Sequence, residues 1–562
     1  MTFIEQTKNL IKTVTDRAIS LSKEKGELSF EAVPEYLIEE PREKEFGDYS
    51  VNAAMLLAKQ ARRAPRDIAN IIVSNMKTEG TDICEVSVAG AGFINFKLDP
   101  SHVTKILNMI EEQGDKFGCS DFGKGAKVNV EFVSANPTGP MHMGNARGGA
   151  MGDCLANIMA LAGFDVTKEF YVNDAGNQIE KLAVSLMARY KQLCLGEENV
   201  EFPEDGYHGD DVREHAKNFY EKHGDSMVNT EEEELKKALI DETLYKNIAA
   251  LKTGLEAYGI NYDVWFHEST LHNENKVLET VEELTKRGYT YEKEGAIWFR
   301  ATDFGLEKDD VLVRANGFVT YFAADIAYHK NKFDRGFETA IDIWGADHHG
   351  HVARLKYAMQ ALGIDPERLE VILMQLVRLV RDGEAVRMSK RTGKAITLGD
   401  LLEETGVDAA RFFFNMRQAN SHFDFDLELA VSQSSENPVF YVQYAHARIC
   451  GILKALEAKG VSVKNVGELD LSLLKEEKEI ELMKEIAKFP EEIKLSARLR
   501  EPSRITKYSM DLATAFHGFY SACKVDCEDE SLKNARLKLV ASCGKVIKNA
   551  LTVMGISAPE HM

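Results

Sequence analysis

Residues 130–153 read VEFVSANPTGPMHMGNARGGAMGD. An apolar, β-branched run, residues 128–133, leads into this stretch and predicts a buried strand. Prolines and a glycine interrupt the chain at 137–140, and from Met141 the residues favour a helix, whose first turn tolerates Pro140. A strand, a turn and a helix start gather free backbone N–H groups and the positive end of the helix dipole at one edge. The stretch therefore predicts a phosphate-binding corner.

Two polar side chains of this corner can act on a phosphate. His142 and Asn145 are three positions apart, so both are expected to project from the first turn of the helix. An imidazole N–H can donate to a developing phosphate charge, and Gly144 leaves room for a flat ring against the backbone. An ordinary strand–helix turn whose histidine only caps the helix would show the same pattern. A second signal is needed to choose between the two.

Length and composition limit the possible classes of protein. The chain has 562 residues, 44% hydrophobic and 28% charged, which is typical of a globular protein with about two to four domains. Its net charge of −21 argues against a general nucleic-acid binder but leaves room for local basic faces. The first residues do not resemble a signal peptide, no apolar run is long enough to span a membrane, and the cysteines lack metal-ligand spacing. We therefore expect a cytoplasmic protein with reduced thiols.

The chain divides into three predicted domains. Residues 1–115 mix helices with strand-like pieces and carry a basic cluster of Lys59, Arg62, Arg63 and Arg66. Phe93 lies where it can stack on unpaired bases, although a core aromatic beside a solvated basic face fits equally well. Residues 116–430 alternate strands with helices, which predicts a parallel sheet covered on both faces, with an acidic, solvated insertion near 195–260 that has no chemistry of its own. Residues 431–562 are predicted to be helical throughout.

Polar residues follow the predicted strand ends. Asn173 and Asp174 lie where parallel strands present ligand-binding side chains. The run GADHHGH, residues 345–351, is dense enough in Asp and His to suggest zinc, but zinc ligands usually come from separated elements. A loop that contacts a nucleotide, with one or two of these histidines facing its ribose or phosphates, fits this position better.

A second loop with chemistry, residues 381–402, reads RDGEAVRMSKRTGKAITLGDLL. Its closely spaced cations and its glycines suit a mobile loop that neutralises a polyphosphate. The cations are Arg387, Lys390, Arg391 and Lys394. Taken alone, a solvated basic turn would explain the segment better.

Together, the two loops resemble the paired signatures of class I aminoacyl-tRNA synthetases, His-x-Gly-x opening a helix and Met-Ser-Lys far downstream. Further segments narrow the resemblance to the arginyl-tRNA synthetase family of the bacterial type. In order along essentially the whole chain they are EFVSANPTGPMHMGNARGGAMGD, YVNDAGNQ, RANGFVTYFAADIAYH, WGADHHGH, MQLVRLVRDGEAVRMSKRTG, DAARFFFNMRQANSHFDFD, ENPVFYVQYAHARICGIL and MGISAPEHM. Two positions depart from the usual pattern: Asn145 replaces a histidine and Arg387 replaces a lysine, yet Asn145 keeps a donor and Arg387 keeps the charge.

The resemblance implies an α/β multidomain protein. It places a Rossmann-type parallel-sheet catalytic domain with insertions at 116–430, an α+β N-terminal tRNA-binding domain at 1–115, and an all-α C-terminal anticodon-binding bundle at 431–562. It implies that L-arginine is activated with ATP, in complex with Mg²⁺, to arginyl-adenylate and then transferred to the 3′ end of tRNA(Arg). It also implies a cytoplasmic monomer with no membrane partner, no tightly bound cofactor and no metal site of its own.

The same resemblance assigns roles to residues. The catalytic residues would be His142, Lys390, Asn145 and Arg391, and ATP would contact Pro137, Gly139, His142, Gly144, Asn145, Asp347, His348, Met388, Ser389 and Lys390. Substrate arginine would contact Glu131, Ser134, Asn136, Asn173, Tyr321 and Asp325. A guanidinium favours a bidentate carboxylate, and Tyr321 and Asp325 are four apart on one face of a predicted helix. The tRNA would contact Phe93, Asn95, Tyr441, Tyr444, His446 and Arg448, although a buried stripe explains the aromatic residues of the last group equally well.

Two other classes of function are compatible with parts of the pattern. A small-molecule adenylyl or cytidylyl transferase shares the His-x-Gly-x corner but would lack the flanking RNA-binding domains. A catalytically silent RNA-binding relative would account for Asn145 and Arg387, whereas the retained Lys390, Glu131 and Asp325 argue against it.

Overall fold

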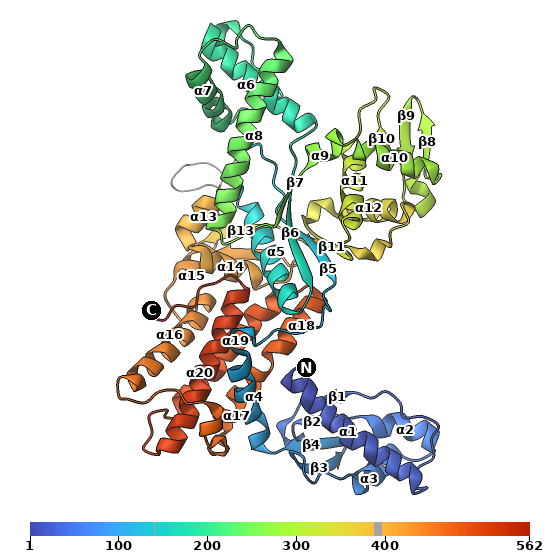
Figure 1. Cartoon of the computed structure of the whole chain (residues 1–562), viewed down its shortest axis with the longest axis vertical. Helices are drawn as coiled ribbons and strands as arrows, with labels where there is room; N and C mark the ends of the chain where they lie inside the picture. Colours follow the sequence, from blue (N-terminus) through green and yellow to red (C-terminus); the bar gives the residue numbers. More distant parts are fainter. Residues whose placement is uncertain (140, 387–395) are drawn as a thin grey trace.

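The computed structural model describes residues 1–139, 141–386 and 396–562. Figure 1 shows an elongated molecule with a parallel sheet at its centre, the N-terminal domain and the C-terminal helices at one end, and two inserted lobes at the other. No helix among the described residues is long and apolar enough to cross a membrane.

The N-terminal domain packs three helices on a small antiparallel sheet, in the strand order β1-β2-β4-β3. Its elements are α1 (Phe3–Glu24), β1 (Ile38–Glu39), β2 (Tyr49–Val51), α2 (Ala53–Ala61), α3 (Pro65–Ser74), β3 (Ile83–Ala89) and β4 (Phe93–Leu98). The helix α4 (Pro100–Gln113) then packs against α17 and α20 of the C-terminal bundle. Its apolar face, including Ile106 and Leu107, belongs to the same core as the central sheet. This helix therefore connects the N-terminal domain to the rest of the molecule.

The central sheet is parallel throughout, with the order β12-β11-β5-β6-β7, which confirms the predicted Rossmann-type architecture. The strands are β5 (Lys127–Glu131), β6 (Asp165–Val172), β7 (Val264–His267), β11 (Thr339–Gly345) and β12 (Leu369–Met374). The crossover helices α5 (Gly144–Leu161), α11 (Tyr321–Asp334) and α12 (His349–Ala361) pack on it. In such sheets, ligands bind outside the carboxyl ends of the strands. In this sheet, we expect the binding site at the carboxyl ends of β5 and β11.

The helix after β5 starts later than the sequence indicates. It begins at Gly144 with Met143 as its N-cap, so the expectation that His142 lies in its first turn is wrong. Residues 141–143 instead pair with residues 396–398: the Leu398 N–H donates to the Met141 carbonyl at 3.0 Å, and the Met143 N–H donates to the Ile396 carbonyl at 3.2 Å. This tertiary pairing keeps Met141 and His142 out of the helix, although local preference favours a helix there.

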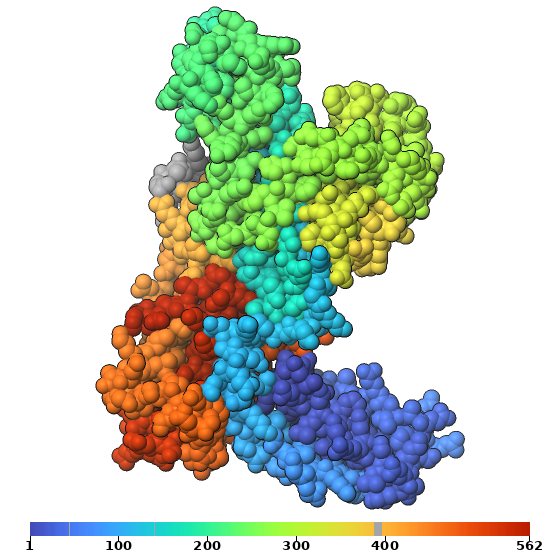
Figure 2. Space-filling model, in the orientation of Figure 1, coloured from blue at the N-terminus to red at the C-terminus, as the bar shows by residue number. Residues whose placement is uncertain are grey.

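Two insertions extend the catalytic domain. The first comprises α6 (Asn177–Leu195), α7 (Asp210–His223) and α8 (Glu232–Ala257), which share their own apolar core. The second comprises α9 (Glu268–Asn273), α10 (Lys276–Lys286) and an antiparallel sheet of β8 (Thr290–Lys293), β9 (Ala296–Phe299) and β10 (Asp310–Val313). Figure 2 shows the two as separate lobes, one at the top of the molecule and one at its right. The long helix α8 returns from the first lobe to the central core through Leu251 and Leu255.

The last third of the chain is dominated by helices. A small sheet comprises β13 (Val377–Arg381), β14 (Glu384–Ala385) and β15 (Phe423–Asp426). The helices α13 (Leu398–Thr405) and α14 (Val407–Asn415) lie between β14 and β15 in the sequence, and α15 (Leu427–Val431) follows β15. The bundle then comprises α16 (Pro438–Glu457), α17 (Glu477–Ala487), α18 (Phe489–Leu499), α19 (Ser503–Ala522) and α20 (Glu530–Val553), so the predicted all-α C-terminal domain is confirmed.

Candidate active site

A cavity of about 560 Å³ opens at the carboxyl ends of β5 and β11. It is lined by many of the residues assigned from the sequence: Glu131, Ser134, Asn136, Gly139, His142, Asn145, Asp325, Asp347 and His348. Tyr321 lines an adjoining hollow together with Asp325, Asp347 and His348. The residues assigned to phosphates and those assigned to the amino acid therefore share one continuous site.

Among the described residues assigned to ATP or arginine, three line neither the cavity nor the adjoining hollow. Pro137 is buried, and its carbonyl accepts a hydrogen bond from the Asn247 amide at 2.8 Å. Gly144 is the first residue of α5. The Asn173 amide, oriented to satisfy its surroundings, donates to the Glu268 carboxylate at 3.2 Å. These residues shape the loops around the cavity.

The imidazole of His142 is oriented by the start of α5. The Gly144 N–H donates to its Nδ1 at 3.2 Å, so Nδ1 carries no proton in the neutral ring and Nε2 does. The side chain is otherwise exposed at the cavity. The loop therefore presents an N–H donor to any anion bound above β5.

The second signature loop is described only at its edges. Pro140, Arg387, Met388, Ser389, Lys390, Arg391 and Lys394 lie outside the described residues. The flanking residues Val386 and Ile396 line a second cavity, of about 1150 Å³, together with His142 and Met143. The edges of the basic loop thus lie beside the His142 loop.

The backbone directly after β5 is strained. Val133 and Ser134 have φ of 69° and 41°, a left-handed conformation that is costly for residues other than glycine, above all for a β-branched one. The Ser134 hydroxyl donates to Glu131 at 2.8 Å and accepts the Tyr171 N–H at 3.1 Å, which holds this turn. Strain of this kind concentrates at functional sites, because the surrounding structure must maintain it.

Three carboxylates stand in a row beneath the cavity. In the register of the sheet, Asp342 on β11 is the partner of Glu131 on β5, and Glu131 is the partner of Glu169 on β6. All three are buried. Parallel strands place such partners side by side, so their charges would repel one another without cations.

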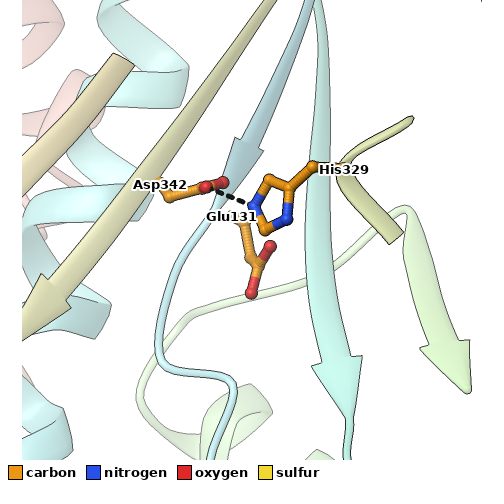
Figure 3. Close-up of side chains that lie close together, drawn as sticks. All are labelled: Glu131, His329 and Asp342. Carbon is orange, nitrogen blue, oxygen red and sulfur yellow. Dashed lines mark hydrogen bonds and ion pairs between the residues drawn. The ribbon is translucent and has the colours of Figure 1, made fainter. Parts of the chain in front are cut away.

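Helix α11 supplies those cations. The Lys332 ammonium lies 2.6 Å from Glu131 and 2.7 Å from Asp342, and Arg335 lies 2.6 Å from Glu169. His329 Nε2 bonds Asp342 at 2.7 Å, as Figure 3 shows. Burial alone would raise the pKa of Asp342, but the charges of Lys332 and His329 outweigh it and lower that pKa to about 2. Burial likewise disfavours the charged form of Lys332, yet the carboxylates keep the pKa of its ammonium above the usual value.

This network bears on two expectations from the sequence. Ligand atoms of Glu131, His329 and Asp342 lie within 4.8 Å of one another, a spacing that would suit a metal ion, but the Lys332 ammonium already supplies the positive charge there. Glu131, assigned to substrate guanidinium, is thus already paired within the protein. Asp325 is half-exposed at the cavity and bonds His351 at 2.8 Å. Asp325 is therefore the better placed of the two carboxylates to bind an incoming cation.

Sequence reasoning missed most of this network. Lys332 and His329 lie on the helix that carries Asp325, Arg335 is the C-cap of that helix, and the three recur at helical spacing. The available signal was a stripe of positively and negatively charged residues on a helix that is otherwise apolar. Tyr171, Tyr328 and Trp344, which also line the cavity, carried no signal beyond that of core aromatics.

The residues assigned to RNA differ in their exposure. Phe93 is exposed, whereas Asn95 on the same strand is buried. His446 is buried, and its Nδ1 bonds the Pro559 carbonyl at 2.9 Å, so it holds the C-terminal tail.

A stacked surface lies on α16 and α19. Arg448 lies over the rings of Tyr444 and Tyr520, at 4.6 Å and 5.2 Å from their centroids, and Tyr444 stacks on Phe440. Tyr444 and Tyr520 are exposed, while the Tyr441 hydroxyl bonds Thr514 at 3.3 Å. We call Tyr444, Arg448 and Tyr520 the aromatic platform.

Comparison with known proteins covers the whole chain. Family models match residues 7–98 (arginyl tRNA synthetase N terminal domain), 105–460 (tRNA synthetases class I (R), catalytic domain) and 442–562 (DALR anticodon binding domain). The chain is 56% identical to an arginine–tRNA ligase of Caldanaerobacter subterraneus, over 100% of this chain and 99% of that protein. It is 55% identical to one of Ruminiclostridium cellulolyticum, over 98% of each.

Solved structures agree. A putative arginyl-tRNA synthetase of Campylobacter jejuni matches with a TM-score of 0.75 and 35% identity, over 83% of this chain and 100% of that one. The arginyl-tRNA synthetase of Thermus thermophilus shares the fold with a TM-score of 0.73 at 22% identity, over 98% of this chain and 100% of that one.

Proposed function

This chain belongs to the arginyl-tRNA synthetase family of class I aminoacyl-tRNA synthetases, and we propose that the cavity at the ends of β5 and β11 is where it activates arginine. The enzyme is an arginine–tRNA ligase: it forms arginyl-adenylate from L-arginine and ATP and transfers the arginyl group to tRNA(Arg). The observation that carries the assignment of the site is that His142 and Asp325 line one cavity.

The arginine end of the cavity is built around Asp325. A guanidinium pairs best with a carboxylate that it can approach in a plane, and Asp325 faces the cavity with Tyr321 beside it. Asn136 and Ser134 line the same wall, near where the substrate's amino and carboxylate groups would lie. Glu131 contributes through Lys332, by fixing the floor of the site.

The phosphate end uses the donors of the signature loops. The substrate carboxylate attacks the α-phosphate of ATP and pyrophosphate leaves, with no covalent enzyme intermediate. Catalysis then depends on positioning and on charge stabilisation. The His142 Nε2–H faces the leaving phosphates, with Asn145 beside it. We propose that Lys390 and Arg391 stabilise the negative charge on the same phosphates. ATP is expected to bind as its Mg²⁺ complex.

The tRNA is proposed to contact both ends of the chain. The exposed Phe93 of the N-terminal domain and the aromatic platform of the bundle offer stacking surfaces, the latter with a cation. A cytoplasmic location, which we propose for the protein, agrees with its eight free cysteines, and we propose that it is a monomer.

The test is arginine-dependent ATP–pyrophosphate exchange, with and without tRNA(Arg), on wild type and Asp325→Asn. Arginine should be activated, with canavanine as the best competitor, whereas lysine and citrulline should be rejected because they lack the charged planar fork. Asp325→Asn should lower kcat/KM for arginine by roughly 10-fold to 100-fold, the effect of a charge-assisted hydrogen bond, and leave KM for ATP unchanged. Wild-type efficiency in this variant would place the arginine site elsewhere.

A further inference from the structure

His351 bridges the arginine-facing carboxylate and a guanidinium of the protein. It lies in the first turn of α12, with its Nε2 at 2.8 Å from Oδ2 of Asp325 on α11. On its other side, the Nε–H of Arg354 donates to its Nδ1 at 2.6 Å. The three side chains form one chain of hydrogen bonds at the wall of the cavity.

The direction of each bond follows from chemistry. A guanidinium has only donors and does not lose its proton in proteins, so Nδ1 of His351 must accept from Arg354. The proton of the neutral imidazole is therefore on Nε2 and is donated to Asp325. One carboxylate oxygen is thereby engaged, and Oδ1 of Asp325 has no hydrogen-bond partner within the described part of the chain.

The bridging ring contacts two aromatic rings. His351 packs edge-on against Phe322 at 5.7 Å and in a tilted arrangement, at 35°, against Trp344 at 5.6 Å, measured between ring centroids. Arg354 in turn lies 5.1 Å over the ring of Phe322 and bonds Asp310 at 3.1 Å. The His351 side chain is 13% exposed, compared with 33% for Asp325. The ring therefore has one orientation and one tautomer.

We infer that His351 and Arg354 are positioning residues that set the direction in which Asp325 presents its free oxygen to substrate arginine. Without the bridge, the half-exposed carboxylate would rotate about its terminal bond, because sp³–sp² torsions are broad. A fixed carboxylate favours a planar, bidentate partner over a point charge, so the bridge contributes to selection of arginine over lysine. The inference rests on the proposed function only in assigning Asp325 to arginine.

The experiment compares His351→Leu with His351→Gln in exchange assays that contain tRNA(Arg). Leucine removes both hydrogen bonds, whereas the glutamine amide offers a donor and an acceptor, as the neutral imidazole does. His351→Leu should raise KM for arginine about 10-fold or more with KM for ATP unchanged, the effect of losing a hydrogen bond to a charged group, and lower the arginine-to-lysine ratio of kcat/KM. In His351→Gln, both KM for arginine and the arginine-to-lysine ratio of kcat/KM should be within about 3-fold of wild type.

Two further variants separate positioning from folding. His349→Gln changes an exposed histidine at the start of the same helix and should behave as wild type. Arg354→Met frees His351 to take the other tautomer and should raise KM for arginine about 3-fold or more, so the inference stays testable if His351→Leu does not fold.

The outcomes distinguish the inference from the proposed function. Equal KM for arginine in His351→Leu and wild type would overturn the inference, as would a His351→Gln variant no better than His351→Leu. An equal rise in KM for ATP and for arginine in His351→Leu would also overturn the inference, since it would show general damage to the site. Absence of arginine-dependent exchange in wild type would instead overturn the proposed function.

Discussion

A single tautomer decides what the His142 loop can donate. Because the Gly144 N–H occupies Nδ1, the proton on Nε2 is available to charge that develops on the leaving phosphates. His142→Ala should lower kcat for exchange roughly 100-fold with little change in KM, since the donor acts mainly on the transition state. Steady-state kinetics check this, with His349→Ala as the control. An unchanged kcat would show that the ring only shapes the loop.

At the same scale, Lys332 holds two buried carboxylates together. Lys332→Met should lower the free energy of unfolding at pH 7 by about 3–5 kcal/mol, because Glu131 and Asp342 would remain buried without the ammonium that they share. The loss should depend on pH. Asp342, with its pKa lowered to about 2, stabilises the fold above its unfolded pKa of about 3.9, and that contribution disappears as the pH falls toward 2.

The difference between wild type and Lys332→Met should therefore shrink as the pH falls below about 4, where protonation relieves the unpaired carboxylates of the variant. Urea midpoints at several pH values measure it. Lys237→Met, at an exposed pair on α8, is the control and should change stability by less than about 0.5 kcal/mol. A difference that is constant from pH 7 to pH 3 would contradict the role given to Lys332.

Among the elements, α8 connects the first insertion to the His142 loop. Its Asn247 donates to the Pro137 carbonyl, and just beyond its end the Tyr258 hydroxyl donates to the Ala146 carbonyl of α5 at 3.1 Å. The sequence predicts that the insertion near 195–260 has no chemistry of its own, yet α8 within it contacts the loop to which we assign the phosphate contacts.

Asn247→Ala should accordingly lower kcat about 10-fold by loosening the loop, and lower stability by about 1–3 kcal/mol by leaving a buried carbonyl unpaired. Exchange kinetics and urea unfolding measure the two effects. Tyr245→Ala, at an exposed site on the same helix, provides the comparison. If both variants lose the same activity, the Asn247 contact is not specific to the loop.

The aromatic platform belongs to the element scale as well. Arg448→Ala removes the cation that lies over Tyr444 and Tyr520 and should weaken binding of tRNA(Arg) about 10-fold. The slope of log affinity against log salt should become shallower by about one, as expected when one cation no longer displaces counterions from the RNA. Titrations at several salt concentrations test both. Tyr520→Phe keeps a ring of the platform and should bind nearly as wild type, and an unchanged slope in Arg448→Ala would remove Arg448 from the interface.

How far the sequence predicts these elements depends on the range of the interactions. The strand before residue 131, the helix that carries Tyr321 and Asp325, and the helical C-terminal domain follow from local pattern. The start of α5 does not, because its position depends on pairing with residues 396–398. The row of carboxylates could not be predicted either, since it arises from the register between strands far apart in the chain.

At the scale of the whole molecule, one buried arginine connects three parts of the chain. Arg411 on α14 is fully buried; its guanidinium pairs with Asp153 of α5 and donates to the Met554 carbonyl at the end of α20, at 2.7 Å, and to the Tyr258 carbonyl beyond α8, at 3.1 Å. Asp153 also pairs with Lys168 of β6 at 2.6 Å. The helix α5, the end of the first insertion and the anticodon-binding bundle thus all contact the guanidinium of Arg411.

Arg411→Met should therefore do more than remove one ion pair. It leaves Asp153 and two buried carbonyls with fewer partners, which should lower the free energy of unfolding by about 3–5 kcal/mol. Because the lost contacts join different parts, limited proteolysis should release the C-terminal bundle earlier than in wild type, in addition to the fall in the urea midpoint. Lys507→Ala, at an exposed pair on α19, should change neither by a measurable amount. If Arg411→Met unfolds at a lower urea concentration but the bundle is not released earlier, Arg411 stabilises its own surroundings without holding the domains together.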